Sequence, residues 1–251
     1  MKNIIKVAAS VSLIAFSASV FATPMTFWDT DGWTQFANDE GHTSGPGGGG
    51  QEFDAEYLYY KKDGNTLSLG LQTGFDVVDG HLLYGNKNYY AGDLALSFDG
   101  ATTIGDASTY EYGVDFGLYT EGYYNVGTGV DMGITGIAGT DDAGLYNASS
   151  WSNNIYYSSQ SSPFALNGGT LVKSLLTNNY GQESDSYFRT VSFDITGLGL
   201  GSDFDIDAHW TMSCGNDNIN GGFSIPEPTM LSLMGVSLLG LGFVRRRKIK
   251  A

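Results

Sequence analysis

The sequence predicts an all-β fold, an antiparallel β-sandwich or jelly roll. Short segments of alternating apolar and polar residues are separated by Gly, Asn, Asp and Ser, a pattern typical of sheets with one buried face. The chain has 36 glycines among 251 residues, and its interior shows no helical repeat of apolar residues. Layered antiparallel sheets are the architecture that buries such strands.

The first 22 residues have the parts of a secretory signal peptide. Lys2 and Lys6 form a positive region, residues 7–20 are apolar or small, and Ala22 is a small residue before the cleavage site. The apolar run is shorter than the ~20 residues of a membrane-spanning helix, so a permanent N-terminal anchor is the weaker alternative. We expect export through the Sec translocon and cleavage by signal peptidase after Ala22.

The remaining body, residues 23–225, has a length suited to one domain. The glycine-rich segment 41–50 has too few side chains to pack and is predicted to be a surface loop. The Asp63-Gly64 pair favours a hairpin between the first two predicted strands, whereas residues 147–160 suit either a loop or a short edge strand. Strands are predicted at residues 53–60, 66–75, 93–98, 110–119, 130–137, 170–175, 187–195 and 203–212.

Residues 203–212 form the clearest half-buried strand. Its apolar residues alternate with Asp203, Asp205, Asp207, His209 and Thr211, so its outer face would carry three carboxylates. Hard cations prefer several oxygen ligands, which makes Asp203, Asp205 and Asp207 candidate calcium ligands, although the sequence has no EF-hand loop. The alternative is a solvated acidic face, and no other cofactor is expected.

The charge of the body argues against nucleic-acid partners. Residues 23–225 contain 5 basic and 26 acidic residues, hence a net charge of −21. Phosphate backbones and anionic lipids would be repelled by such a surface.

The sequence has no recognisable catalytic motif. Its histidines lie in no zinc-protease motif and beside no nucleophile motif. His209 and Cys214 are close in sequence, but an extended strand would hold them about 16 Å apart. Cys214 is the single cysteine, which excludes an intramolecular disulfide and leaves two interpretations, a thiol for attachment or a small residue beside a turn. We expect a body without catalytic residues.

Tyrosines indicate one further ligand class. Exposed rings on a β-sheet can stack on sugars, whereas buried rings would fill the core and cover strand edges. Neighbouring tyrosines point to opposite faces of a strand, so both outcomes are expected within one pair. The pairs are Tyr59 and Tyr60, Tyr89 and Tyr90, Tyr123 and Tyr124, and Tyr156 and Tyr157.

Three signals follow one another at the C-terminal end. Pro226, Glu227 and Pro228 precede an apolar stretch at 229–244, and the basic cluster is Arg245, Arg246, Arg247 and Lys248. As a helix the stretch would span about 24 Å, short of the ~30 Å hydrocarbon core, so snorkelling arginines and local thinning would complete a single transmembrane helix. The basic tail 245–250 is expected in the cytoplasm and the body on the other side.

This order of signals resembles the PEP-CTERM sorting signal of Gram-negative bacteria, here residues 226–251. The resemblance implies that a membrane-embedded exosortase recognises and removes the tail. It further implies a precursor held transiently in the inner membrane with its body in the periplasm, and a mature form that is secreted or lies at the outer surface.

Segments of the body are also similar to exosortase-dependent surface proteins. The similar segments are QEFDAEYLYYKKDGNTLSLGLQTGF, GDLALSF, YEYGVDF and HWTMSCGNDNI. This resemblance implies surface display or a place in the extracellular matrix, and it brings no catalytic residues. The sequence therefore predicts an exported, exosortase-processed protein with a structural or adhesive role in a biofilm matrix, where exopolysaccharide is an expected partner. The alternatives are a carbohydrate-binding module, with or without calcium, and then an exported hydrolase.

Overall fold

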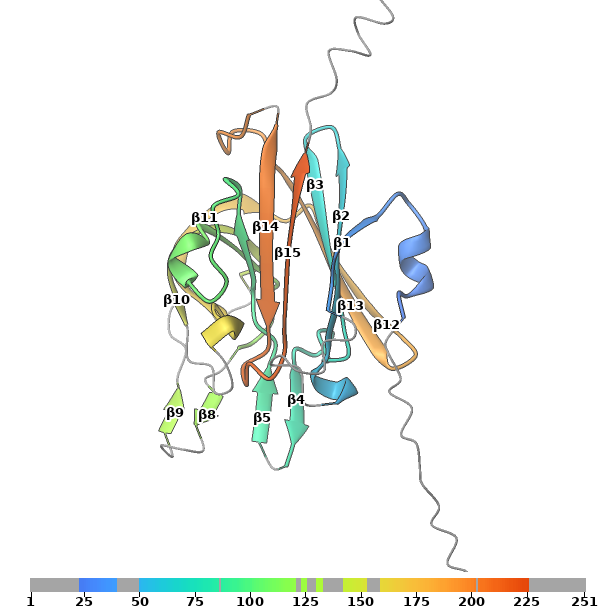
Figure 1. Ribbon diagram of the computed structural model, residues 1–251, viewed down its shortest axis with the longest axis vertical. Coiled ribbons are helices and arrows are strands. Elements are labelled where there is room, and N and C mark those ends of the chain that lie inside the picture. The colour runs from blue at the N-terminus through green and yellow to red at the C-terminus, as the bar shows by residue number, and fades with distance from the viewer. Residues whose placement is uncertain are drawn as a thin grey trace, which may run out of the picture.

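The structure, a computed structural model, shows a body of antiparallel sheets and confirms that the fold is all-β (Figure 1). The described part of the chain forms two main antiparallel sheets, two separate hairpins and short 3-10 helices, and none of its helices is long and apolar enough for a membrane crossing. The described residues are 23–39, 50–85, 87–120, 123–125, 130–132, 142–152, 159–201 and 203–225. The expected signal peptide 1–22 with Ala22, nearly all of the loop 41–50, and residues 226–251 with the expected transmembrane helix lie outside them.

The five-stranded sheet has the order β1-β2-β3-β13-β12. β2 and β3 form the predicted hairpin, and Asp63 pairs with Thr66 across a turn of only Gly64 and Asn65. Lys61 and Lys62 therefore belong to β2 and not to the connection, because the Asp-Gly pair closes the turn in two residues. The strands are β1 (Thr34–Asn38), β2 (Ala55–Asp63), β3 (Thr66–Thr73), β13 (Ser186–Asp194) and β12 (Thr177–Glu183).

The six-stranded sheet has the order β11-β10-β7-β6-β14-β15. Its strands are β11 (Ala165–Ser174), β10 (Gly144–Ser152), β7 (Tyr112–Asp115), β6 (Leu94–Ser97), β14 (Phe204–Thr211) and β15 (Asn218–Ile225). The segment 147–160 begins neither as a loop nor as an edge strand, because β10 lies between β7 and β11. β7 is much shorter than the predicted 110–119, since Asp115 Oδ1 accepts a hydrogen bond from Gly117 N (2.7 Å) where the chain turns.

Two hairpins lie at the end of the body opposite to the end of β15 (Figure 1). They pair β4 (His81–Tyr84) with β5 (Lys87–Tyr90), and β8 (Tyr123–Asn125) with β9 (Val130–Met132). β9 is the beginning of the predicted strand 130–137, and the residues after Met132 lie outside the described part of the chain. The 3-10 helices are η1 (Thr26–Asp29), η2 (Gln51–Phe53), η3 (Ala107–Thr109) and η4 (Ser159–Ser161).

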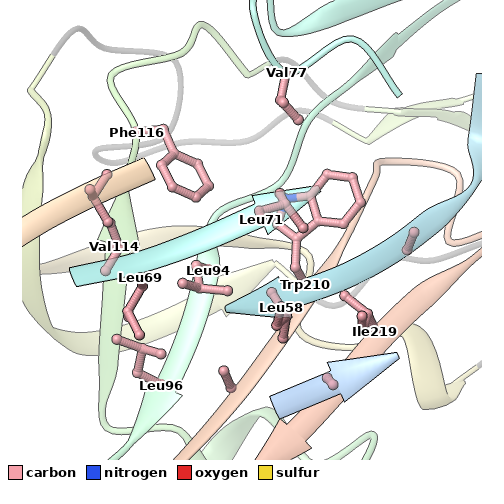
Figure 2. Packing of buried hydrophobic residues seen from close by; sticks show 14 of the residues in the cluster. Leu58, Leu69, Leu71, Val77, Leu94, Leu96, Val114, Phe116, Trp210 and Ile219 are labelled. Atoms are coloured by element: carbon pink, nitrogen blue, oxygen red, sulfur yellow. The ribbon is translucent and has the colours of Figure 1, made fainter. Parts of the chain in front are cut away.

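The two main sheets share one hydrophobic cluster (Figure 2). The five-stranded sheet contributes Leu67, Leu69 and Leu71, as their period-two spacing predicts, and the six-stranded sheet contributes Leu96 and Trp210. All five side chains are at most 2% exposed. Complete burial of each such side chain contributes ~1.5–3 kcal/mol, so this shared cluster is the main source of stability between the sheets.

The outer face of the five-stranded sheet is covered by the N-terminal segment of the body. Trp28 of η1 stacks on Tyr59 of β2 with ring centroids 4.1 Å apart. Tyr59 and its same-face neighbour Tyr57 are buried, and for Tyr59, a member of the predicted pairs, the interpretation as a buried ring is confirmed. β3 is buried on both faces for the same reason.

Candidate functional site

A shallow groove of about 550 Å³ lies at the end of the six-stranded sheet where β14 begins. Its volume is in the range of ligand sites. Four lining residues are acidic and none is basic, so we call it the acidic groove. Its lining residues are Phe98, Asp99, Glu111, Tyr112, Asn147, Gly199, Leu200, Gly201, Asp203, Phe204 and Asp205.

Three aromatic rings form the apolar part of the acidic groove. Phe98, which follows β6, contacts Tyr112 of β7 edge-to-face at 5.0 Å and Phe204 of β14 at 6.1 Å. Phe98 is buried, while Tyr112 and Phe204 are half-buried. The groove therefore offers ring surface next to carboxylates.

Two of the four carboxylates hold the walls of the groove together. Asp99 Oδ1 accepts a hydrogen bond from Ala101 N (2.9 Å) and closes a turn, while Asp205 accepts one from Ser224 Oγ. Gly100 has a φ of +69°, and a Cβ at this position would lie 2.9 Å from Asp205 Oδ2, so only glycine suits this turn.

The other two carboxylates are available to a ligand. Among the described residues, the side chains of Glu111 and Asp203 have no hydrogen-bond partner. Glu111 is half-buried and Asp203 is exposed.

The predicted calcium ligands lie on one face of β14 but do not converge. Asp203 and Asp205 line the acidic groove, whereas Asp207 is half-buried and accepts a hydrogen bond from Thr102 Oγ1 (2.8 Å). Asp205 and Asp207 are also both engaged in hydrogen bonds, because Asp205 accepts one from Ser224 Oγ and Asp207 accepts the one from Thr102 Oγ1. In the described ranges no three His, Cys, Asp or Glu residues are grouped as a metal site.

A second group of carboxyls lies inside the body, where β2 begins beside the β14–β15 connection. Asp217 Oδ2 accepts a hydrogen bond from Ala55 N (2.8 Å), which joins the two main sheets. Burial raises the pKa of Asp54 to about 7, with a further contribution from repulsion by Asp217, and burial also raises the pKa of Asp217. Neither residue lines the acidic groove or the hollow of about 340 Å³ around Tyr187.

Glu56 is the third carboxyl of this interior group and is completely buried. Ser186 Oγ and Gln51 Nε2 donate to its Oε1 (both 2.7 Å), and Gln72 Nε2 donates to Oε2 (2.6 Å). Burial raises the pKa of Glu56 to about 7, although these three donors act in the opposite direction. Because Glu56 is fully hydrogen-bonded, its role here is to hold strands together.

The buried guanidinium of Arg189 is held by hydrogen bonds to neighbouring segments of the chain. It donates to the backbone oxygens of Val77 (2.8 Å) and Phe116 (2.9 Å) and to Asn178 Oδ1 (3.0 Å). Burial lowers its pKa to about 10. Arg189 thus fastens two connections to β12 and β13.

His209 and Cys214 have different surroundings. His209 is completely buried and donates from Nδ1 to Asn220 Oδ1 (2.7 Å), whereas Cys214 packs in the shared hydrophobic cluster beside the β14–β15 turn. Burial lowers the pKa of His209 to about 4 and raises that of Cys214 to about 12. A reactive thiolate is disfavoured in this environment, which fits the interpretation of Cys214 as a small residue beside a turn.

Most described tyrosines of the predicted pairs contact other aromatic rings. Tyr60 stacks on Phe223 at 3.7 Å, Tyr89 contacts Phe53, and Tyr90 is buried. The side chains of the other four paired tyrosines lie outside the described part of the structure. The aromatic surface of the acidic groove instead comes from residues on separate strands, which no sequence pair indicated.

The fold and the groove define an acidic, all-β body whose last strand leads directly into a C-terminal processing signal. Residues 224–248 match the family model described as the PEP-CTERM protein-sorting motif, which confirms the resemblance seen in the sequence. The motif indicates that the protein is exported, processed by an exosortase and sorted to the cell envelope. No curated protein and no solved structure is significantly similar to the chain.

Proposed function

We propose that this chain is an exosortase-processed surface or extracellular-matrix protein whose body has a structural or adhesive role and no catalysis. The observation that carries the proposal is the sorting motif at residues 224–248. We propose that the two main sheets form a β-sandwich. Their shared hydrophobic cluster would stabilise the exported body without a disulfide. Asp54, Glu56 and Asp217, the interior carboxyls with raised pKa, line neither of the two hollows described above, which favours a structural role for them.

The test is the full chain with Pro226, Glu227 and Pro228 all replaced by alanine, expressed in the native host. We expect the variant to remain as a full-length precursor in the membrane fraction, because the recognised segment is lost. Intact mass and cell fractionation measure the outcome. A variant with the mass and location of the processed wild-type protein would overturn the proposal.

A second candidate function is carbohydrate binding in the acidic groove. Its support is the combination of three aromatic rings with available carboxylates and the amide of Asn147. Affinity electrophoresis in neutral polysaccharide gels tests it, with Tyr112→Ala expected to abolish retardation. Tyr84→Ala, on the exposed tip of β4, is the control, and EDTA should have no effect because the proposal needs no calcium. Wild-type protein that migrates without retardation would reject this candidate.

A further inference from the structure

The sorting motif and the folded body overlap in sequence. The match begins at Ser224, whereas β15 continues to Ile225. Ser224 pairs with Asp205 and Ile225 with Phe204 across the β14–β15 ladder. Ile225 is only 7% exposed and belongs to the shared hydrophobic cluster, so Pro226 follows an anchored residue without any spacer.

Because the tripeptide is short, an enzyme that binds the tripeptide must also lie close to the folded body. Three extended residues span at most about 10 Å, so Pro226, Glu227 and Pro228 separate Ile225 from the apolar stretch by no more than that. An enzyme that binds this segment therefore contacts the surface around the end of β15. The alternative is to detach β15, which would break its ladder with β14 and expose Ile225.

The acidic groove is the surface next to this end of β15. Phe204 and Asp205 line the groove and are also the ladder partners of Ile225 and Ser224. The groove therefore begins one strand spacing, ~4.8 Å, from the segment that enters the motif.

The negative charge of the acidic groove favours a basic partner. The carboxylates of Glu111 and Asp203 have no partner among the described residues. An anionic lipid surface would repel them, whereas a basic protein surface would bind them and would be steered toward them during encounter.

We infer that the acidic groove is a docking surface for a basic, membrane-proximal segment of the exosortase, so that the enzyme binds the body and the motif together. This inference rests on the proposed function. Two linked contacts raise the effective concentration of the motif at the enzyme without lengthening the motif itself. The body thereby contributes to the rate at which its own tail is removed.

The test compares two charge-reversal pairs in the full chain, followed by pulse–chase and intact mass in the native host. The groove pair is Glu111→Lys with Asp203→Lys. The control pair is Glu52→Lys with Asp185→Lys, which makes the same change in net charge at two exposed residues lining the hollow around Tyr187. We expect processing of the groove pair to be about tenfold slower and that of the control pair to be unchanged.

Limited proteolysis of each precursor first establishes that the body is folded. If the groove pair has lost protease resistance, Glu111→Gln with Asp203→Asn replaces it, and a smaller slowing in the same direction is expected. Wild-type processing of a folded groove variant overturns the docking inference, as does equal slowing in both pairs, which would indicate net charge alone. The alanine variant of the tripeptide distinguishes the docking inference from the proposed function. Normal processing of that variant would overturn the proposed function, whereas normal processing of the groove variant overturns only the docking inference.

Discussion

Gln72 shows how one buried amide holds a covering segment on a sheet. Its side chain is completely buried on the outer face of β3. Gln72 Oε1 accepts hydrogen bonds from Met25 N (3.0 Å) and Trp28 Nε1 (2.6 Å). Its Nε2 donates to Thr23 O (2.9 Å) and to Glu56 Oε2 (2.6 Å). The amide thus uses two acceptor and two donor contacts, all that its geometry provides.

Replacement of this amide should be costly. We expect Gln72→Ala to lower the free energy of unfolding by about 3 kcal/mol, because buried donors and acceptors lose their partners and a cavity is left. Urea unfolding of the purified protein measures the effect.

Gln182→Ala is the matched control, since that side chain is exposed and makes one hydrogen bond to Ser184 O (3.2 Å). Its expected change is within about 0.5 kcal/mol. Equal effects of the two substitutions would contradict the role of Gln72.

The two edge strands β1 and β15 meet because one position has no side chain. A Cβ built on Gly221 would lie 2.5 Å from the Cβ of Ala37, closer than real Cβ contacts allow. Phe223 of β15 stacks on Tyr60 of β2 beside this point. The glycines that make β15 a poor strand by propensity are therefore what lets the two sheets approach along this edge.

A double-mutant cycle tests this contact between strands. Gly221→Ala should lower the free energy of unfolding by about 2 kcal/mol through overpacking, and Ala37→Gly by less than about 1 kcal/mol. The double variant should be more stable than the sum of the two single effects predicts, because one methyl group has been moved and not added. Additive effects, measured by urea unfolding, would show that Gly221 and Ala37 do not compete for the same space.

Strand prediction succeeded where apolar and polar residues alternate along the strand. It failed for strands such as β12, whose place at the edge of a sheet requires few apolar residues. β13 and β14 were predicted to within one residue at each end, because apolar residues recur on their inner faces, interrupted in β13 only by the buried Arg189. β12, with the sequence TNNYGQE, has no such pattern, and as an edge strand it needs little apolar surface. In β14 the predicted outer face is exposed only at its beginning, because His209 and Thr211 are covered by other segments and completely buried.

The interior carboxyls connect the sheets and make stability depend on pH. Asp54 and Glu56 each have a folded-state pKa of about 7, above their ordinary values of 3.8 and 4.5. The folded protein therefore keeps protons that the unfolded chain releases. The corresponding stabilisation is complete below pH ~4 and is lost as the pH rises through about 7.

We therefore expect the melting temperature to fall by several degrees between pH 5 and pH 8. Asp54→Asn should reduce this slope, since it removes one group that must lose a buried proton. Calorimetry across the pH range measures both. The exposed Asp203→Asn is the control for a change in net charge, and a slope in Asp54→Asn equal to that of the wild type would contradict the raised pKa of Asp54.

At the scale of the whole molecule, local patterns were enough to establish the all-β class, the β2–β3 hairpin and the PEP-CTERM motif. Each of these depends on contiguous residues or on a short period along the chain. The acidic groove, the interior carboxyls and the covering of β3 by residues 23–33 depended on the order of strands in the sheets. Glu111, Asp203 and Phe98 come from three separate segments, and only the pairing of β6 with β7 and β14 brings them together. Period-two alternation determines which face of a strand is buried, but neighbouring strands determine which side chains meet.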